Sequence, residues 1–195
     1  MWLSELWRAK ICLELFQQSG LWENHYKGIS DANIAMDQIL QSDMSESKKL
    51  TSLGEMLFIR SFLYFELVQQ FGKVPLVTEG SFEIRTDFKR AAIADIYKQI
   101  ITDLRTAGEY LPGKVDDPQK GKPTSYAASH LLAKVYLTRG SAVTDVRGQK
   151  ATDMDSVLYF AENVIKNSPY RLQKNFADLW NIDNMGNSEV IFAVQ

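Results

Sequence analysis

The sequence predicts an all-α protein: a tetratricopeptide-like stack of antiparallel helical hairpins that ends in an irregular, loop-rich C-terminal segment. Long stretches place apolar residues at helical spacing, and short polar or glycine-containing breaks separate them. One stretch, Glu46 to Phe71, is apolar on two sides, as expected of a helix that packs between two others. Such pairs of helices are typical of helical-repeat proteins, although no strict period of about 34 residues is present. A length of 195 residues fits one domain over residues 1–195.

The N-terminal part is expected to form two helices. The first covers residues 3–18 and ends at Ser19-Gly20, because serine and glycine favour a helix end. The second covers residues 22–41, where apolar residues recur every four and then every three positions and so share one face. That face carries Trp22, Tyr26, Ile29, Asn33, Met36 and Leu40.

A third helix is expected from Glu46 to Phe71. It stops at Gly72, and the following residues to Thr86 are expected to be extended, because Pro75 and the neighbouring valines disfavour a helix.

Three further helices are expected, over residues 88–111, 126–139 and 153–167, with Thr124 or Ser125 capping the second of them. A short helical turn is expected near residues 176–180, and residues 189–194 are β-prone and predict a strand. A strand at this place would have an unpaired edge. The chain is therefore expected either to be cut short after it or to tuck this segment into a groove.

Composition and charge argue against several classes of function. The net charge of −2 gives no reason to expect a nucleic acid or an anionic membrane as partner. The single cysteine, Cys12, excludes an intramolecular disulfide, and no metal-ligand spacing is present, so neither a metal nor a cofactor is expected. No apolar run is long enough to cross a bilayer, and the first residues lack the pattern of a signal peptide. The chain is therefore expected to be cytosolic, or exported with a leader that was removed or is not included.

Four segments of the chain resemble the SusD/RagB family of outer-membrane nutrient-binding proteins. The most specific segment runs from Glu55 to Val77, with the pattern Glu-x-x-Phe-Ile-Arg-Ser-Phe-x-Tyr-Phe-x-Leu-Val-x-x-Phe-Gly-x-Val-Pro-Leu-Val. The others are the Trp/Tyr/Ile/Asn helix of residues 22–33, the alanine-rich helix of residues 127–137 and the Ser-Glu-Val-Ile-Phe stretch of residues 188–192. Their order and spacing agree with the family.

The resemblance implies a helical N-terminal half and a longer, loop-rich C-terminal half. It also implies a lipidated cysteine that anchors the protein to the outer membrane, and a role as the lid of a TonB-dependent transporter to which it delivers glycans or other nutrients. This chain departs from the family in two respects. Cys12 lies within a helical pattern without a preceding signal peptide, and the chain ends where the family's C-terminal half, with much of its ligand site, would begin. The expectation is a surface-exposed SusD-like helical domain without that half, the anchor or the signal peptide.

Trp22, Glu23, Asn24 and His25 are candidate ligand-binding residues. They follow a Ser-Gly pair and combine aromatic, amide and carboxylate groups. A sugar ring stacks on an aromatic face, while amides and carboxylates bind its hydroxyls. The alternative is that Trp22 begins the core face and that Asn24 and His25 are solvated, since tryptophan is mostly buried in proteins.

Asn33 and Arg60 are expected to be structural, because both lie within apolar stripes. A buried guanidinium without a partner costs several kcal/mol, so an acceptor is expected close to Arg60. Buried polar groups are hydrogen-bonded in proteins, which favours a network that holds helices together over a ligand site.

No enzyme is predicted, since no Ser/His/Asp arrangement, phosphate-binding loop or zinc-protease spacing is present. Asp116-Asp117 is expected to be a solvated loop pair, and His130 a packed or rim histidine. The leading hypothesis is non-catalytic glycan binding at the cell surface in partnership with a TonB-dependent transporter. The alternative is a helical-repeat scaffold that binds a protein and no sugar. A glycan-processing enzyme would need two carboxylates in a cleft, and the sequence indicates no such pair.

Overall fold

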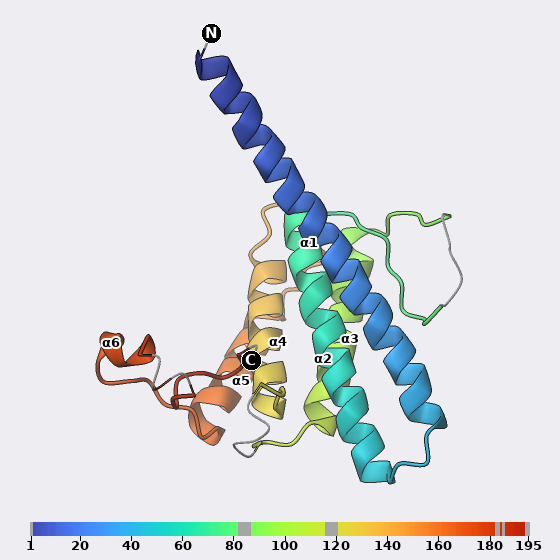
Figure 1. The fold of residues 1–195 in the computed structure, drawn as a ribbon. Coiled ribbons are helices and arrows are strands. Elements are labelled where there is room, and N and C mark those ends of the chain that lie inside the picture. Colours follow the sequence, from blue (N-terminus) through green and yellow to red (C-terminus); the bar gives the residue numbers. More distant parts are fainter. Residues whose placement is uncertain (1, 82–86, 116–120, 182–183, 185, 194–195) are drawn as a thin grey trace.

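A computed structural model describes the backbone of residues 2–81, 87–115, 121–181, 184 and 186–193, and the side chains of these residues from Gly20 onwards. Each long helix packs against the next one along the chain, so the helices form a serial stack (Figure 1). The all-α stack predicted from the sequence is confirmed. The helices are α1 (Trp2–Gln41), α2 (Glu46–Phe71), α3 (Ile93–Tyr110), α4 (Ser125–Gly140), α5 (Asp153–Asn167) and the short α6 (Phe176–Leu179).

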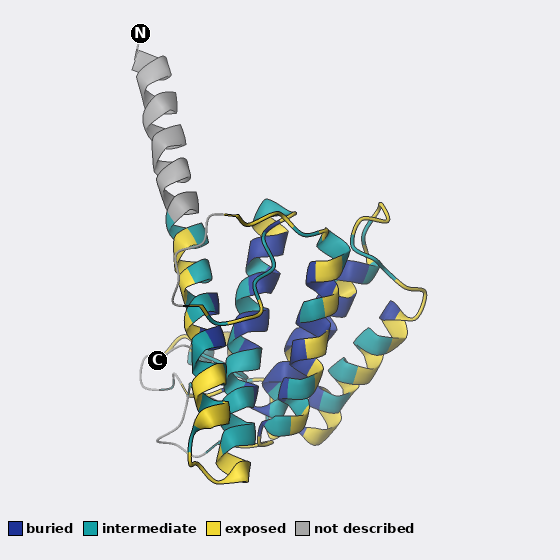
Figure 2. Cartoon of the chain, turned by 90° about the vertical axis from the view of Figure 1, so that its right-hand side faces the viewer, coloured by how far each residue is buried: buried dark blue, intermediate teal, exposed yellow. Residues whose placement is uncertain are grey.

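The core lies where α2, α3 and α4 meet, and the buried faces of these helices point toward one another (Figure 2). Small residues on α4 contribute to this contact, because Ala127 and Ala128 are almost fully buried and allow a neighbouring helix to come close. On these three helices, the largest fully buried apolar side chains are Tyr64, Leu67, Ile96, Tyr97, Ile100, Leu104, Leu132 and Val135.

The expected helix end at Ser19-Gly20 is wrong, because α1 continues through both residues as one helix. A glycine inside a helix costs only about 1 kcal/mol relative to alanine, whereas proline, which this stretch lacks, would break the backbone ladder. A Cβ atom placed on Gly20 would meet nothing within 4 Å, so no close packing demands glycine here. Cys12 lies in the part of α1 whose side chains are outside the described residues.

The predicted start of the next helix at residue 88 is also wrong, since α3 begins at Ile93. The residues before it pair with the chain that leaves α2: Pro75 and Arg90 form an antiparallel bridge, and the Ala91 N–H donates to the Val74 carbonyl at 2.9 Å. Backbone groups engaged in this pairing are not available to the first turn of a helix.

The C-terminal segment packs against the core through Ile191 and Phe192 and forms no strand over its described residues, so the predicted strand is wrong for residues 189–193, while Val194 lies outside the described residues. Phe192 packs edge-on against Phe58 of α2, with 5.1 Å between ring centroids, and the Arg171 N–H donates to the Ser188 carbonyl at 2.8 Å. A β-prone sequence forms a strand only where a partner strand supplies hydrogen bonds. Here the segment is held by the packing of Phe192 against α2 and not by hydrogen bonds to a partner strand.

A buried ion pair joins the end of α4 to the start of α5. Arg139 Nε donates to Asp153 Oδ2 at 3.0 Å and a second guanidinium nitrogen donates to Oδ1, while the Lys150 backbone N–H also donates to Oδ2 at 3.0 Å. Burial by itself raises the pKa of the Asp153 carboxyl, but these hydrogen bonds outweigh it and hold that pKa below its usual range. This pair was not predicted from the sequence.

Candidate functional site

A pocket of about 860 Å³ lies between α1 and the chain that connects α2 to α3. This connection runs alongside α1 in both views (Figures 1 and 2). We call the cavity the aromatic pocket, since three of its lining residues are aromatic. It is lined by Trp22, Tyr26, Ile29, Ser30, Pro75, Val77, Glu79, Gly80, Ser81 and Phe88.

The helical wall of the aromatic pocket presents residues from successive turns of α1. Trp22, Tyr26 and Ser30 are four residues apart and therefore lie one above another on the helix surface. The rings of Trp22 and Tyr26 are 4.9 Å apart and tilted by 44°, and Trp22 also packs edge-on against Phe71 at 5.1 Å. These contacts hold the indole in one place at the pocket surface.

Hydrogen bonds hold the opposite wall against the helices. The Tyr26 hydroxyl donates to the Pro75 carbonyl at 2.7 Å, and the Asn33 amide donates to the carbonyls of Val77 and Glu79 at 3.1 and 3.3 Å. Burial raises the pKa of Tyr26, and the nearby Tyr64 adds to this rise. The connecting chain is thus fixed to α1 at three alternate backbone positions, residues 75, 77 and 79.

Gly80 allows this wall to approach α1 closely. A Cβ atom on Gly80 would lie 2.6 Å from Asp37 Oδ2 and 3.1 Å from the α1 backbone at Ile34. Any side chain at residue 80 would therefore push the wall outward.

Tyr64 of α2 supports the same wall from inside. Its hydroxyl accepts a hydrogen bond from the Val77 N–H at 2.7 Å and donates to the Val77 carbonyl at 3.0 Å. Burial raises the pKa of Tyr64 to about 12, although the Val77 hydrogen bond and the Arg60 charge act in the opposite direction.

Tyr64→Phe is expected to lower the free energy of unfolding by about 1–2 kcal/mol, because the Val77 N–H loses its partner while the ring stays packed. Urea unfolding followed by circular dichroism measures this change. Tyr159→Phe is the matched control, since Tyr159 is exposed and its hydroxyl is in water, and we expect a change within about 0.5 kcal/mol. Equal effects of the two substitutions would contradict the role assigned to Tyr64.

Beneath the pocket, Arg60 connects three elements through one buried network. Its Nε and one terminal nitrogen each donate to Asp103 of α3 at 2.8 Å. The other terminal nitrogen donates to Asn33 Oδ1 at 2.8 Å and to the Thr78 carbonyl at 3.0 Å. Arg60, Asp103 and Asn33 are each at most 5% exposed as whole residues. The network therefore ties α1, α2, α3 and the pocket wall together.

The four neighbouring residues proposed from the sequence do not share one site. Trp22 lines the aromatic pocket, whereas Glu23 and Asn24 are exposed and do not line it. His25 lies between α1 and α2, where one ring nitrogen is 2.6 Å from Glu66 Oε2 and the other is 2.7 Å from the Leu21 carbonyl. Adjacent residues in a helix point about 100° apart, so four in a row cannot face one ligand.

The other residues that line the pocket were not predicted as ligand-binding from the sequence. Ser30 could have been found, because it lies two helical turns after Trp22 on the same face. Glu79 and Phe88 come from the connecting chain, whose position depends on tertiary hydrogen bonds, and no local signal places them next to α1.

Three polar groups at the aromatic pocket are free to bind a ligand. The Trp22 indole N–H, the Ser30 hydroxyl and the Glu79 carboxylate form no hydrogen bond with any other described residue. The indole N–H is a hydrogen-bond donor, the hydroxyl can donate or accept, and the carboxylate is an acceptor. Phe88 adds a ring that is 45% exposed. Aromatic faces combined with such polar groups suit a polar ring such as a sugar.

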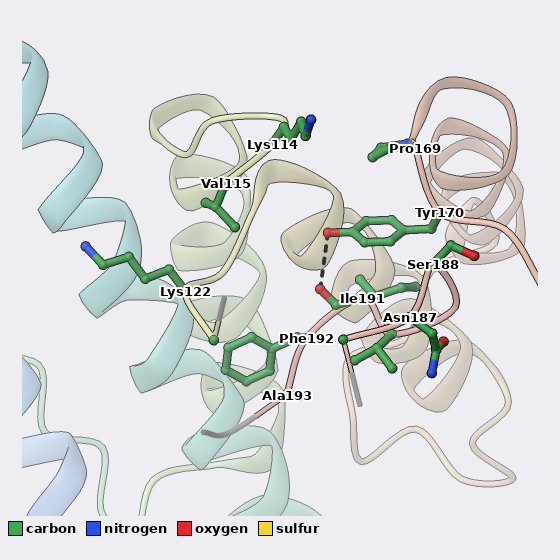
Figure 3. Close-up of a pocket in the computed structure, with 13 residues that line it drawn as sticks. Lys114, Val115, Lys122, Pro169, Tyr170, Asn187, Ser188, Ile191, Phe192 and Ala193 are labelled. Carbon is green, nitrogen blue, oxygen red and sulfur yellow. Dashed lines mark hydrogen bonds between the residues drawn. The ribbon is translucent and has the colours of Figure 1, made fainter. Parts of the chain in front are cut away.

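A second pocket, of about 200 Å³, lies where the C-terminal segment meets the loop before α4 (Figure 3). Lys122 at one end forms an ion pair with Glu55 at 3.1 Å, and Tyr170 donates to the Ile191 carbonyl at 3.2 Å, as the dashed line shows (Figure 3). Because the pocket is small and these polar groups are engaged, we consider the aromatic pocket the better candidate.

His130 lies on α4 and lines a third pocket, of about 540 Å³, between α4, α5 and the C-terminal segment. Partial burial of its ring, together with the nearby Lys134, lowers its pKa. Asp116 and Asp117 fall outside the described residues. Within the described ranges, no cluster of three or more His, Cys, Asp or Glu side chains could hold a metal ion. None of the helices in the described part combines the length and apolarity needed to cross a bilayer.

Comparison with known proteins places the chain in a family. The SusD-like family model described as "Starch-binding associating with outer membrane" matches residues 4–137. The chain belongs to the SusD-like family. A SusD-like protein of Bacteroides ovatus is 29% identical over 181 residues, which is 91% of this chain and 32% of that protein. A SusD-like protein of Formosa agariphila is 30% identical over 187 residues, covering 90% of this chain and 33% of that protein.

Solved SusD-like structures share the fold. A crystal structure with xylogluco-oligosaccharide superposes with a TM-score of 0.81 at 29% identity, over 91% of this chain and 35% of that one. A laminarin-binding SusD-like protein superposes with a TM-score of 0.78 at 29% identity, over 88% of this chain and 36% of that one. This SusD-like chain spans about a third of the length of the relatives it matches.

Proposed function

We propose that this SusD-like chain binds a glycan without catalysing a reaction, and that the aromatic pocket contributes to the binding site. The observation that carries the proposal is the combination of exposed ring surface from Trp22 and Phe88 with the free polar groups of Trp22, Ser30 and Glu79. Of the four neighbouring residues suggested by the sequence, only Trp22 remains in the proposed site.

Family membership supports the wider role. Relatives in this family bind glycans, as the xylogluco-oligosaccharide and laminarin examples illustrate, and the family is associated with the outer membrane. We therefore propose a location at the cell surface and delivery of the ligand to a TonB-dependent outer-membrane transporter. No cofactor is required, since rings and hydrogen-bonding groups are sufficient to hold a sugar.

Isothermal titration with xylogluco- and laminari-oligosaccharides tests the proposal. Trp22→Ala is expected to weaken binding at least tenfold, about 1.4 kcal/mol, because the variant loses a ring face and an N–H donor. Trp22→Phe keeps a ring against Phe71 and is expected to retain part of the affinity, which separates loss of binding from loss of folding.

Trp180→Ala is the matched control, since Trp180 is 73% exposed and does not line the aromatic pocket. Its affinity is expected to equal that of the wild-type chain. Absence of saccharide binding at millimolar concentration, or equal losses in both tryptophan variants, would refute the proposed site. The scaffold alternative would then gain, because a scaffold leaves saccharides unbound.

A further inference from the structure

We infer that Glu79 makes the aromatic pocket selective for neutral saccharides over acidic ones that carry carboxylate or sulfate groups. The inference rests on the proposed function and names the class of glycan that the site accepts. It follows from the charges that the described residues bring to the pocket.

Glu79 is the one charged side chain among the described residues that line the aromatic pocket; the others are aromatic, aliphatic, serine or glycine. Its carboxylate is exposed and forms no ion pair with another described residue. A second carboxylate lies at the same edge, since Asp37 Oδ2 borders Gly80. Glu79 thus places one negative charge in the pocket lining, and Asp37 adds a second beside it, outside the lining.

Arg90 brings an opposing charge to Tyr26, another residue of the pocket lining. Arg90 also pairs through its backbone with Pro75. Glu79 forms no ion pair with another described residue, so no direct contact among them neutralises its charge.

The two classes of saccharide meet this carboxylate differently. A neutral sugar offers hydroxyl donors, and an ionised carboxylate is a strong acceptor that can bind two of them. A uronate or sulfated sugar brings its own negative charge close to Glu79 and Asp37, and like charges at short range repel even near a protein surface. The same side chain therefore favours one class and disfavours the other.

A matched pair of ligands tests the inference: a laminari-oligosaccharide, and the same oligosaccharide with its primary alcohols oxidised to carboxylates. We expect the wild-type chain to bind the neutral form about tenfold more tightly at low salt, and the preference to shrink as salt screens the repulsion. Glu79→Gln keeps the shape and removes the charge. It is expected to weaken binding of the neutral ligand severalfold and to strengthen binding of the oxidised one.

Glu109→Gln is the control, because Glu109 is an exposed carboxylate on α3 that does not line the aromatic pocket. Its preference is expected to match that of the wild-type chain. Equal binding of both ligands by the wild-type chain, or an unchanged preference in Glu79→Gln, would overturn the inference and leave glycan binding intact. Failure of the wild-type chain to bind either ligand would instead overturn the proposed function itself, and the inference with it.

Discussion

Asp103→Leu is expected to lower the free energy of unfolding by about 3–5 kcal/mol, as measured by urea unfolding. The substitution removes both acceptors that Arg60 uses on α3 and leaves its guanidinium buried with only Asn33 Oδ1 and the Thr78 carbonyl. An ionised group that is 5% exposed and has lost its counter-charge is costly. The loss should therefore far exceed that of an ordinary surface ion pair.

Two further variants make this result specific. Asp31→Asn breaks the exposed pair between Lys27 and Asp31 on α1 and is expected to change stability by no more than about 1 kcal/mol. Arg60→Met combined with Asp103→Leu removes both charges, and we expect it to recover part of the loss, since an apolar pair can replace a buried ion pair. If Asp103→Leu cost no more than Asp31→Asn, the network would not hold the helices together.

Arg139→Met is expected to lower the free energy of unfolding by about 3 kcal/mol or more at neutral pH, and this loss should shrink on acidification. In the wild-type chain the folded pKa of Asp153 lies below its unfolded value. Its contribution is thus complete above the usual aspartate pKa of about 3.9 and is lost as the pH falls through the folded pKa. Without Arg139, burial is left as the largest influence and raises that pKa, so the variant gains stability as Asp153 takes up a proton.

Urea unfolding of both proteins between pH 7 and pH 3 measures this difference. Lys166→Met, which breaks the exposed pair with Glu162 on α5, is the control, and its effect is expected to be small throughout this range. A gap between wild type and Arg139→Met that stays constant with pH would show that the Asp153 carboxylate does not stabilise the α4–α5 junction.

Local sequence signals predicted much of the helical stack. The bounds of α2 and α5 follow from the spacing of apolar residues, and Gly72 ends α2 with a φ of 68°, a conformation that glycine adopts readily. Thr124 caps α4 by accepting a hydrogen bond from the Ala127 N–H at 3.2 Å. These features depend on neighbours a few residues away, so they can be read from the chain.

Predictions failed where a distant partner decides the outcome. Ser19-Gly20 is the exception, since α1 continues through it for a local reason: glycine costs only about 1 kcal/mol within a helix. Residues 189–193 have strand-forming side chains, yet within the described chain they pack on α2 through Phe192 and find no partner strand. The sequence indicated that Arg60 needs an acceptor, whereas only the fold shows that Asp103 supplies it from 43 residues away.

The sequence by itself determined the family, the all-α class, the order of most helices and the structural character of Asn33 and Arg60, because helical periodicity and buried polar residues leave a local pattern. Only the tertiary structure decided where a ligand could bind. Trp22 and Ser30 meet Glu79 and Phe88 because hydrogen bonds from Tyr26, Asn33 and Tyr64 draw the chain after α2 against α1. Contacts between residues tens of positions apart depend on the folded path of the chain, and no short-range pattern encodes them.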